Sequence, residues 1–363
     1  MKRLGLYTLL SFLICHMVHA DMHVFKQQVA PANILNDGKL HIYFCGTGDP
    51  EIAMQSIRKP SCLAVVGDNQ MFMIDVGEGG SQNLGALGLP LGSINNIFVT
   101  HWHSDHMAGI GYLNNVSWLS GRKSALTLYG PSGVKKIVEA LNQLYALDGL
   151  YRATNREGLL NLKANQINPV LVSAPYDGEG EPLLKANNIQ LTPFRVNHNP
   201  AYPALGYTIN YKSCKIVISG DTKIMNNLAT VAKNADLLIN EAFSHYYGQI
   251  IQNAFKSQPN LKISELFYKQ TAHYHSDTLA LAKMAAASKV KNLIITHLVP
   301  AIPATKQAKD DFIKGMNAYY SGPITVADDR DEIVISSNNG KCEFEYKPAK
   351  QYDIQTIQSI RTS

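Results

Sequence analysis

Five short apolar runs of this chain end in a histidine or an aspartate, and this pattern constrains the fold more than any other feature. The runs are rich in Val, Ile, Leu, Met or Phe, which is typical of buried strands. A polar side chain where a buried strand emerges is well placed to serve a site on a rigid scaffold. We therefore expect several strands to deliver candidate ligands to one place. The five runs are "MFMID" ending at Asp75, "NIFVTHWHSDH" ending at His106, "LTPFRVNH" ending at His198, "KIVISGD" ending at Asp221 and "NLIITH" ending at His297.

The order of elements favours an α/β fold. Strand-like runs dominate the first part of the chain, and helical patterns cover 132–147, 223–234 and 275–290. We expect two sheets packed face to face with helices outside, in one domain with its core at about 38–347. The stretch 150–186 is rich in Asn, Gly, Pro and charged residues, and is expected to be a loop or small insert within a single domain of residues 21–363.

Residues 1–20 differ from the rest of the chain. Lys2 and Arg3 precede the apolar stretch "LGLYTLLSFLICHMV", which leads to "VHA" and then Asp21. A short basic region, an apolar core and a small residue at the cleavage point are typical of a secretory signal peptide. The apolar stretch is shorter than the ~20 residues that span a bilayer. We expect removal of residues 1–20 after Ala20, a periplasmic or secreted protein, and no stable membrane insertion.

Charge argues against a nucleic-acid partner. The formal charge of +5 falls to +3 without Lys2 and Arg3, because residues 1–20 contain no acidic residue. No block of basic residues stands out, so a small-molecule partner is the better expectation.

Four cysteines remain after residue 20. Export permits disulfides, but buried free thiols are an equally open alternative for Cys45, Cys62, Cys214 and Cys342.

The segment "HWHSDH", residues 101–106, has the spacing of a metal site. If the chain stays extended after Thr100, His101 and His103 point to the same side and can meet one ion. Asp105 and His106 follow as the chain turns into a helix, so they suit a second ion, roughly 3.5–4 Å from the first. Imidazole with carboxylate suits Zn²⁺ first, with Mn²⁺ or Fe as alternatives. A lone histidine such as His198 can equally be a core residue, so the whole set carries the prediction.

In its order and its strand-end placement, the series "HWHSDH", His198, "SGDT" and "ITH" resembles the metallo-β-lactamase superfamily over roughly Gly46 to His297. The resemblance implies a four-layer αβ/βα sandwich of two mixed sheets with a dinuclear metal site at one edge. It also implies a role for Asp75, which would accept the free N–H of a ligand imidazole and fix its tautomer. The implied ligands are His101, His103 and His198 for one ion, Asp105, His106 and His297 for the other, and Asp221 as the bridge.

Other segments resemble the branch that contains ribonuclease Z and the metal-dependent alkyl- and arylsulfatases. A bridging Asp in place of a Cys argues against the zinc β-lactamases. Asn240 and Asp277 depart from that branch, which usually has His and Thr there. The resembling segments are "CGTGDP", "RKPSCLAVV" with Arg58 and Ser61, "NPAYPALGYTI", "INEAF" and "YHSDTLALAKMAA".

The resemblance supplies a mechanism in which a hydroxide shared by two ions attacks the substrate and Asp105 serves as both ligand and catalytic residue. His275 would protonate the leaving oxygen, with Glu241 orienting the imidazole. The alternative for His275 is a surface histidine beside a helix start capped by Ser276.

The chain departs from ribonuclease Z where that family carries its long tRNA-binding arm, because few residues separate His198 from Asp221. We therefore expect an exported dinuclear zinc hydrolase of a small sulfate or phosphate ester. Alternatives are a ribonuclease Z-like phosphodiesterase or nuclease, then a lactonase, and last a non-enzymatic metal-binding module. The oligomeric state, including a homodimer, stays open.

Several aromatic residues could line a pocket for an aryl or alkyl group, although ordinary packing is their more common use: Trp102, Trp118, Tyr202, Tyr207, Tyr246, Tyr247 and Tyr274.

Overall fold

The structure is a computed structural model that describes residues 30–50, 58–156, 158–256 and 262–349. The expected signal peptide, residues 1–20, lies outside the described residues. Within the described ranges, no helix combines the length and the apolar character needed to cross a bilayer.

The first sheet has eight strands in the order β15-β14-β1-β2-β3-β4-β5-β6. Neighbours from β15 to β3 are antiparallel and those from β3 to β6 are parallel, so the sheet is mixed. Its strands are β1 (Leu40–Gly46), β2 (Cys62–Gly67), β3 (Gln70–Val76), β4 (Ile94–Phe98), β5 (Leu126–Gly130), β6 (Ile167–Leu171), β14 (Glu332–Asn338) and β15 (Lys341–Lys347).

The second sheet has seven strands in the order β13-β12-β11-β10-β9-β8-β7. It is also mixed, because β7 to β10 pair antiparallel and β10 to β13 run parallel. Its strands are β7 (Leu184–Ala186), β8 (Ile189–His198), β9 (Ala201–Tyr211), β10 (Cys214–Ile218), β11 (Leu237–Phe243), β12 (Leu293–Val299) and β13 (Ile324–Val326).

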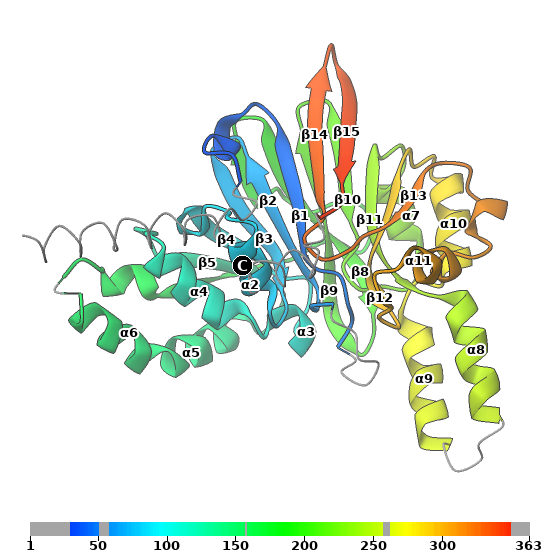
Figure 1. The fold of residues 1–363 in the computed structure, drawn as a ribbon, viewed down its shortest axis with the longest axis horizontal. Helices are drawn as coiled ribbons and strands as arrows, with labels where there is room; N and C mark the ends of the chain where they lie inside the picture. The colour runs from blue at the N-terminus through cyan, green and yellow to red at the C-terminus, as the bar shows by residue number, and fades with distance from the viewer. Residues whose placement is uncertain (1–29, 51–57, 157, 257–261, 350–363) are drawn as a thin grey trace, which may run out of the picture.

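Helices cover the outer faces of both sheets (Figure 1). On the side of the first sheet lie α2 (Gly80–Ala86), α3 (Ser104–Met107), α4 (Ile110–Leu119), α5 (Val134–Leu144) and α6 (Ala146–Thr154). On the side of the second lie α7 (Asn226–Val231), α8 (His245–Lys256), α9 (Lys262–Tyr274), α10 (Thr278–Ala287) and α11 (Lys306–Phe312). Short 3₁₀ turns are η1 (Ile34–Asn36), η2 (Leu91–Ser93), η3 (Leu162–Asn165) and η5 (Met316–Ala318).

The buried apolar residues form three main layers, and the alternation along β3 shows how. Phe72 and Ile74 pack between the two sheets, whereas Met71 and Met73 pack under the helices of the first sheet. A strand covered on both faces reads as a continuous apolar run, which is why β3 has no polar face. A third layer lies between the second sheet and α7, α10 and α11. The predicted four-layer sandwich is confirmed.

The expected helices correspond to observed ones. The pattern over 132–147 becomes α5 and the start of α6, that over 223–234 contains α7, and that over 275–290 contains α10. The stretch 150–186 holds the end of α6, η3 and the strands β6 and β7, which form one edge of each sheet. Helices α8 and α9 were not predicted. They project from the sandwich beside the end of β11 (Figure 1).

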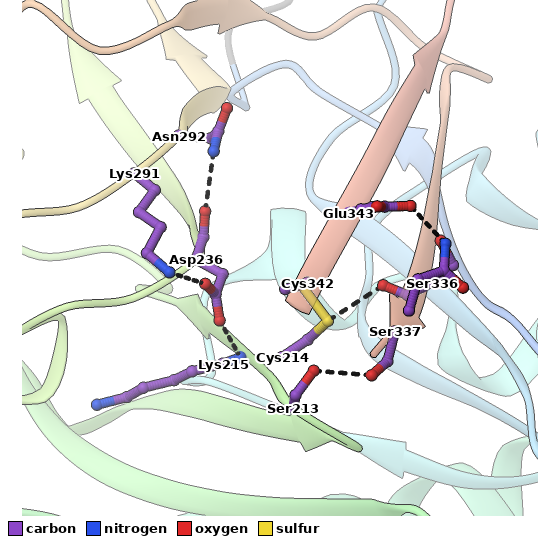
Figure 2. The surroundings of a disulfide bond; sticks show 11 residues. Ser213, Cys214, Lys215, Asp236, Lys291, Asn292, Ser336, Ser337, Cys342 and Glu343 are labelled. Atoms are coloured by element: carbon purple, nitrogen blue, oxygen red, sulfur yellow. Dashed lines mark hydrogen bonds and ion pairs between the residues drawn. A yellow bond between two sulfur atoms is a disulfide. The ribbon is translucent and has the colours of Figure 1, made fainter. Parts of the chain in front are cut away.

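The four cysteines form two disulfides and are not buried free thiols. Cys45 and Cys62 join β1 to β2, and Cys214 and Cys342 join β10 of the second sheet to β15 of the first. Figure 2 shows the second bridge, beside which Ser213 Oγ and Ser337 Oγ lie 2.7 Å apart. The Cys214–Cys342 bridge therefore links the two sheets covalently.

Candidate metal centre

The ends of parallel strands from both sheets meet at one edge of the sandwich. The backbone N–H of Leu205 in β9 donates to the carbonyl of Thr100, which follows β4, across 3.0 Å. Gly220 allows this approach, because its φ of +60° is left-handed and a Cβ there would lie 2.6 Å from the Leu205 carbonyl oxygen. The segment after β4 and the segment after β10 are thus brought together.

The first group of donor atoms consists of three histidine nitrogens. His103 Nδ1 lies 2.9 Å from His101 Nε2 and 3.2 Å from His198 Nε2. His198 Nδ1–H donates to the carbonyl of Tyr274 at 3.1 Å, which leaves the Nε2 lone pair free to face the group. His101 and His103 point to the same side, as predicted for residues two positions apart on an extended chain.

The second group combines carboxylates and imidazoles. Oδ2 of Asp105 lies 3.1 Å from His297 Nε2 and 3.2 Å from His106 Nε2. The two Nε2 atoms are themselves 3.2 Å apart. All these side chains are buried. Asp105 and His106 belong to α3, which begins directly after His103, so the turn into this helix separates the two groups as the sequence predicted.

Asp221 lies between the two groups. Its Oδ2 is 3.2 Å from His297 Nε2 and 3.3 Å from His106 Nε2. The same atom is 3.7 Å from His198 Nε2 and 4.0 Å from His101 Nε2. Its Oδ1 is buried without a hydrogen-bond partner among the described residues. A buried carboxylate oxygen left in this way is costly unless a cation compensates it.

The donor set fits divalent metal ions. Nitrogen ligands of tetrahedral Zn²⁺ sit about 2.0–2.1 Å from the ion and therefore roughly 3.3 Å from one another. The contacts within each group, 2.9–3.2 Å in the first and 3.1–3.3 Å in the second, are close to that spacing. Imidazole with carboxylate suits Zn²⁺, and also Mn²⁺ or Fe.

Charge differs between the two groups. Burial lowers the pKa of His101 and lowers that of His198 to about 4, so both imidazoles are neutral near pH 7. Burial on its own would lower the pKa of His297 as well, but Asp221 and Asp105 outweigh it and raise the pKa to about 9. The two carboxylates thus attract positive charge to the second group, and a metal ion there would compete with the proton.

Asp75 lies behind the second group. Its Oδ2 is 2.7 Å from His106 Nδ1, and it accepts hydrogen bonds at 2.8 Å from the backbone N–H and the hydroxyl of Thr100. The backbone of Asp75 has a φ of 56° and that of His297 a φ of 42°, the left-handed region that non-glycine residues rarely adopt. Strain of this kind is stored where the surrounding structure fixes a functional side chain.

His275 and Glu241 form a pair beside the two donor groups. Nδ1 of His275 is 3.1 Å from Oε2 of Glu241, whose Oε1 accepts from the backbone N–H groups of Ser276 at 2.8 Å and Thr222 at 3.1 Å. Burial alone would lower the pKa of His275, but Glu241 outweighs it and the pKa is raised. Ser276 is not the cap of α10, because Asp277 is its N-cap.

One pocket, which we call the central pocket, exposes part of both donor groups. It is lined by His103, Asp105, His198, Asp221 and His297, by His275 and by residues of α9. Tyr274 of α9, one of the aromatic residues expected to line a pocket, does line it, whereas the sequence did not indicate Thr271 of α9 or Asp49, although Asp49 belongs to the "CGTGDP" segment. Two aromatic candidates are instead core residues. Trp118 and Tyr207 are buried, where they donate to the carbonyls of Asn161 and Val99.

Comparison with known proteins agrees with the fold. Residues 40–250, more than half of the chain, match the family model of anti-Pycsar protein Apyc1. A ribonuclease Z of Mycobacterium bovis (strain BCG / Pasteur 1173P2) is 27% identical over 299 residues, 82% of this chain and 98% of the relative.

Solved structures share the architecture. The metallo-β-lactamase fold protein YhfI from Bacillus subtilis gives a TM-score of 0.58 at 17% identity, over 82% of this chain and 99% of that one. The short form of human tRNase Z gives a TM-score of 0.56 at 21% identity, over 81% of this chain and 98% of that one. A diphosphatase from the PhnP family gives a TM-score of 0.53 at 16% identity, over 85% of this chain and 100% of that one. The chain therefore belongs to the Apyc1 family of anti-Pycsar proteins, within the ribonuclease Z-like branch of the metallo-β-lactamase superfamily.

Proposed function

We propose that this protein is a metal-dependent phosphodiesterase that uses two ions, Zn²⁺ before Mn²⁺ or Fe. The observation that carries the proposal is the position of Asp221 Oδ2, which lies within 4.0 Å of ligand nitrogens of both donor groups. A shared carboxylate between two complete ligand sets is the arrangement that two-metal hydrolases use to hold their ions about 3.5–4 Å apart. The complete set also argues against a non-catalytic metal-binding module.

Seven residues would hold the two ions in this proposal. His101, His103 and His198 would hold one ion, Asp105, His106 and His297 the other, and Asp221 both. Bound there, the ions supply Lewis acidity toward the phosphoryl oxygens and activate water.

His275 handles the leaving group in this proposal. Its Nδ1 faces Glu241, so its Nε2 is the atom left to give a proton to the leaving oxygen as the P–O bond breaks. Glu241 accepts the Nδ1–H of His275, which orients the ring and favours the imidazolium form that carries a second proton on Nε2, and two backbone N–H groups hold Glu241 in turn. Glu241 is thus a positioning residue for His275.

The relatives favour phosphate over sulfate. The sequence alone ranked small sulfate and phosphate esters together and put a ribonuclease Z-like phosphodiesterase second. Ribonuclease Z, tRNase Z and a PhnP-family diphosphatase are named for the cleavage of phosphate linkages. We therefore rank the phosphodiesterase first, and neither a sulfate ester nor a lactone has support from these names.

Substrate size is a separate question. The residues between His198 and Asp221 are taken up by β9, β10 and tight turns, which leaves no long arm at that place. This supports a small phosphodiester rather than a folded RNA. The names of the relatives nevertheless denote ribonucleases, so an RNA substrate belongs in the test.

We also propose that the protein is exported. Both disulfides bring together all four cysteines that follow residue 20, and disulfides persist in oxidising compartments. This supports the interpretation of residues 1–20 as a signal peptide and of a periplasmic or secreted location.

The test is a substrate panel assayed with the wild type, Asp105→Asn and the matched control Asp310→Asn, whose carboxylate is exposed on α11. The panel contains methyl p-nitrophenyl phosphate, p-nitrophenyl sulfate, a nitrophenyl-substituted lactone and a precursor tRNA. We expect hydrolysis of the phosphodiester, unchanged in Asp310→Asn and reduced at least a hundredfold in Asp105→Asn. Faster turnover of the sulfate would reverse the ranking, and phosphodiesterase activity unchanged in Asp105→Asn would refute the site.

A further inference from the structure

A second hollow shares His103 with the central pocket. It is lined by His101, Trp102, His103, Pro200, Ala201 and Tyr202, among others. Because His101 and His103 both belong to the first donor group, this hollow lies beside that group. Because Trp102, Pro200 and Tyr202 supply its non-ligand walls, we call this hollow the aromatic subsite.

Trp102 is fixed in place although it is half-buried. Its indole Nε1–H donates to the carbonyl of Ser132 at 2.9 Å. Its ring lies against Gly130, where a Cβ would come within 2.6 Å of the ring carbons. The glycine thus leaves room for the indole, and the hydrogen bond holds it beside His103.

Tyr202 is also fixed, although 57% of its surface is exposed. Its hydroxyl accepts from Arg195 Nη1 at 2.6 Å and lies 2.7 Å from the hydroxyl of Tyr176. Arg195 itself donates to the carbonyl of Ala174 from Nη2 at 2.8 Å and from Nε at 3.2 Å, and its guanidinium lies 4.3 Å from the centre of the Tyr176 ring. An exposed aromatic ring held by such a network loses little freedom when a ligand packs on it.

The two hollows differ in chemistry. The central pocket contains His275, the proton donor in our proposal, whereas the aromatic subsite offers two aromatic rings, two prolines and an alanine besides its two histidines. In our proposal the leaving oxygen faces His275 in the central pocket, and the aromatic subsite is the hollow beside the first donor group that can take the other ester group. Aromatic walls attract a planar ring through dispersion and offset stacking.

We propose that the aromatic subsite binds a planar aromatic group on the ester arm that stays attached to phosphorus, with Tyr202 as the specificity-determining residue. This inference rests on the proposed phosphodiesterase function and adds to it a class of substrate, diesters whose retained arm carries an aromatic ring. The chemistry of the walls recognises the flat apolar face of the ring.

The kinetic test compares two diesters with the same leaving group. Bis(p-nitrophenyl) phosphate retains an aryl arm, and methyl p-nitrophenyl phosphate retains a methyl arm. Tyr202→Ala should raise KM for the first substrate about tenfold and leave KM for the second within twofold. Tyr202→Phe, which keeps the ring, should stay within about threefold of the wild type, and Tyr151→Ala, an exposed tyrosine on α6, should change neither.

A binding readout separates the subsite from turnover. The chain has two tryptophans, and Trp118 is buried, so acrylamide quenching of fluorescence reports mainly on Trp102. Phenylphosphonate should protect Trp102 in the wild type and need about tenfold higher concentration in Tyr202→Ala, whereas methylphosphonate should protect it weakly in both. Equal KM changes for both diesters, or equal protection by both phosphonates, would overturn the subsite alone. A wild type that hydrolyses neither diester would overturn the proposed function.

Discussion

Asp75 Oδ2 lies 2.7 Å from Nδ1 of His106, on the far side of the ring from the Nε2 that faces His297. Through this contact Asp75 accepts the Nδ1 proton of His106, which leaves Nε2 as the atom that would bind a metal ion. We predict that Asp75→Asn weakens metal binding at the second group by about 10–100-fold, the usual cost of losing a carboxylate behind a ligand histidine. Titration against a chelating dye measures the loss, with Asp310→Asn as the control. An unchanged affinity would show that Asp75 does not orient the ligand.

His275 should matter most when the leaving group is a poor one. An alkoxide needs a proton as it departs, whereas p-nitrophenolate does not. We predict that His275→Ala slows cleavage of a dinucleotide about 10²–10⁴-fold but slows bis(p-nitrophenyl) phosphate less than tenfold. Glu241→Gln should follow the same pattern more weakly. The control is His273→Ala, an exposed histidine two residues away. Equal losses on both substrates would assign His275 a structural role.

The Cys214–Cys342 disulfide should stabilise the pairing of the two sheets. It closes a sequence separation of 128 residues, against 17 for Cys45–Cys62. A longer closed loop removes more entropy from the unfolded chain, so replacing both Cys214 and Cys342 by Ser should cost about 2–5 kcal/mol. Urea unfolding measures the cost, and the matched Cys45/Cys62 double variant should lose less. No change in stability on reduction would mean that the bridges do not form.

Glu332 gives a testable dependence of stability on pH. Burial alone would raise its pKa, but hydrogen bonds from His41 and Tyr43, each 2.7 Å long, outweigh burial and hold the pKa below the ordinary value of 4.5. The ionised group therefore adds stability above pH 4.5, and this is lost as the pH falls through the folded pKa. Glu332→Gln should cost about 1 kcal/mol at pH 7. The cost should shrink below pH 4.5 in urea titrations, and a pH-independent cost would contradict this account.

The sequence predicted the position of the candidate site because strand ends are local features. Asp75, His198, Asp221 and His297 each end an apolar run, and parallel strands bring such ends to one edge. The spacing within residues 101–106 also predicted that His101 and His103 belong to one donor group and Asp105 and His106 to the other. Side-chain direction can be predicted here because an extended chain turns into a helix.

Features that depend on tertiary contacts were beyond this kind of prediction. The pairing of Cys214 with Cys342 depends on how two sheets pack. The carbonyl of Tyr274 that orients His198 is a backbone group, which carries no residue-type signal. Aromatic residues near the motifs look alike in sequence, yet Tyr207 is core while Tyr202 lines a hollow. Helices α8 and α9 also went unpredicted.

The number of metal ions bound per chain tests the central claim most directly. Elemental analysis of protein equilibrated with Zn²⁺ and freed of excess ion should give close to two ions for the wild type and for Asp310→Asn. Replacing the shared Asp221 by Ala should reduce that number to one or fewer, since Asp221 lies against both donor groups. A wild type that retains no metal, or an Asp221→Ala variant that still binds two ions with unchanged affinity, would contradict a two-ion centre built around this carboxylate.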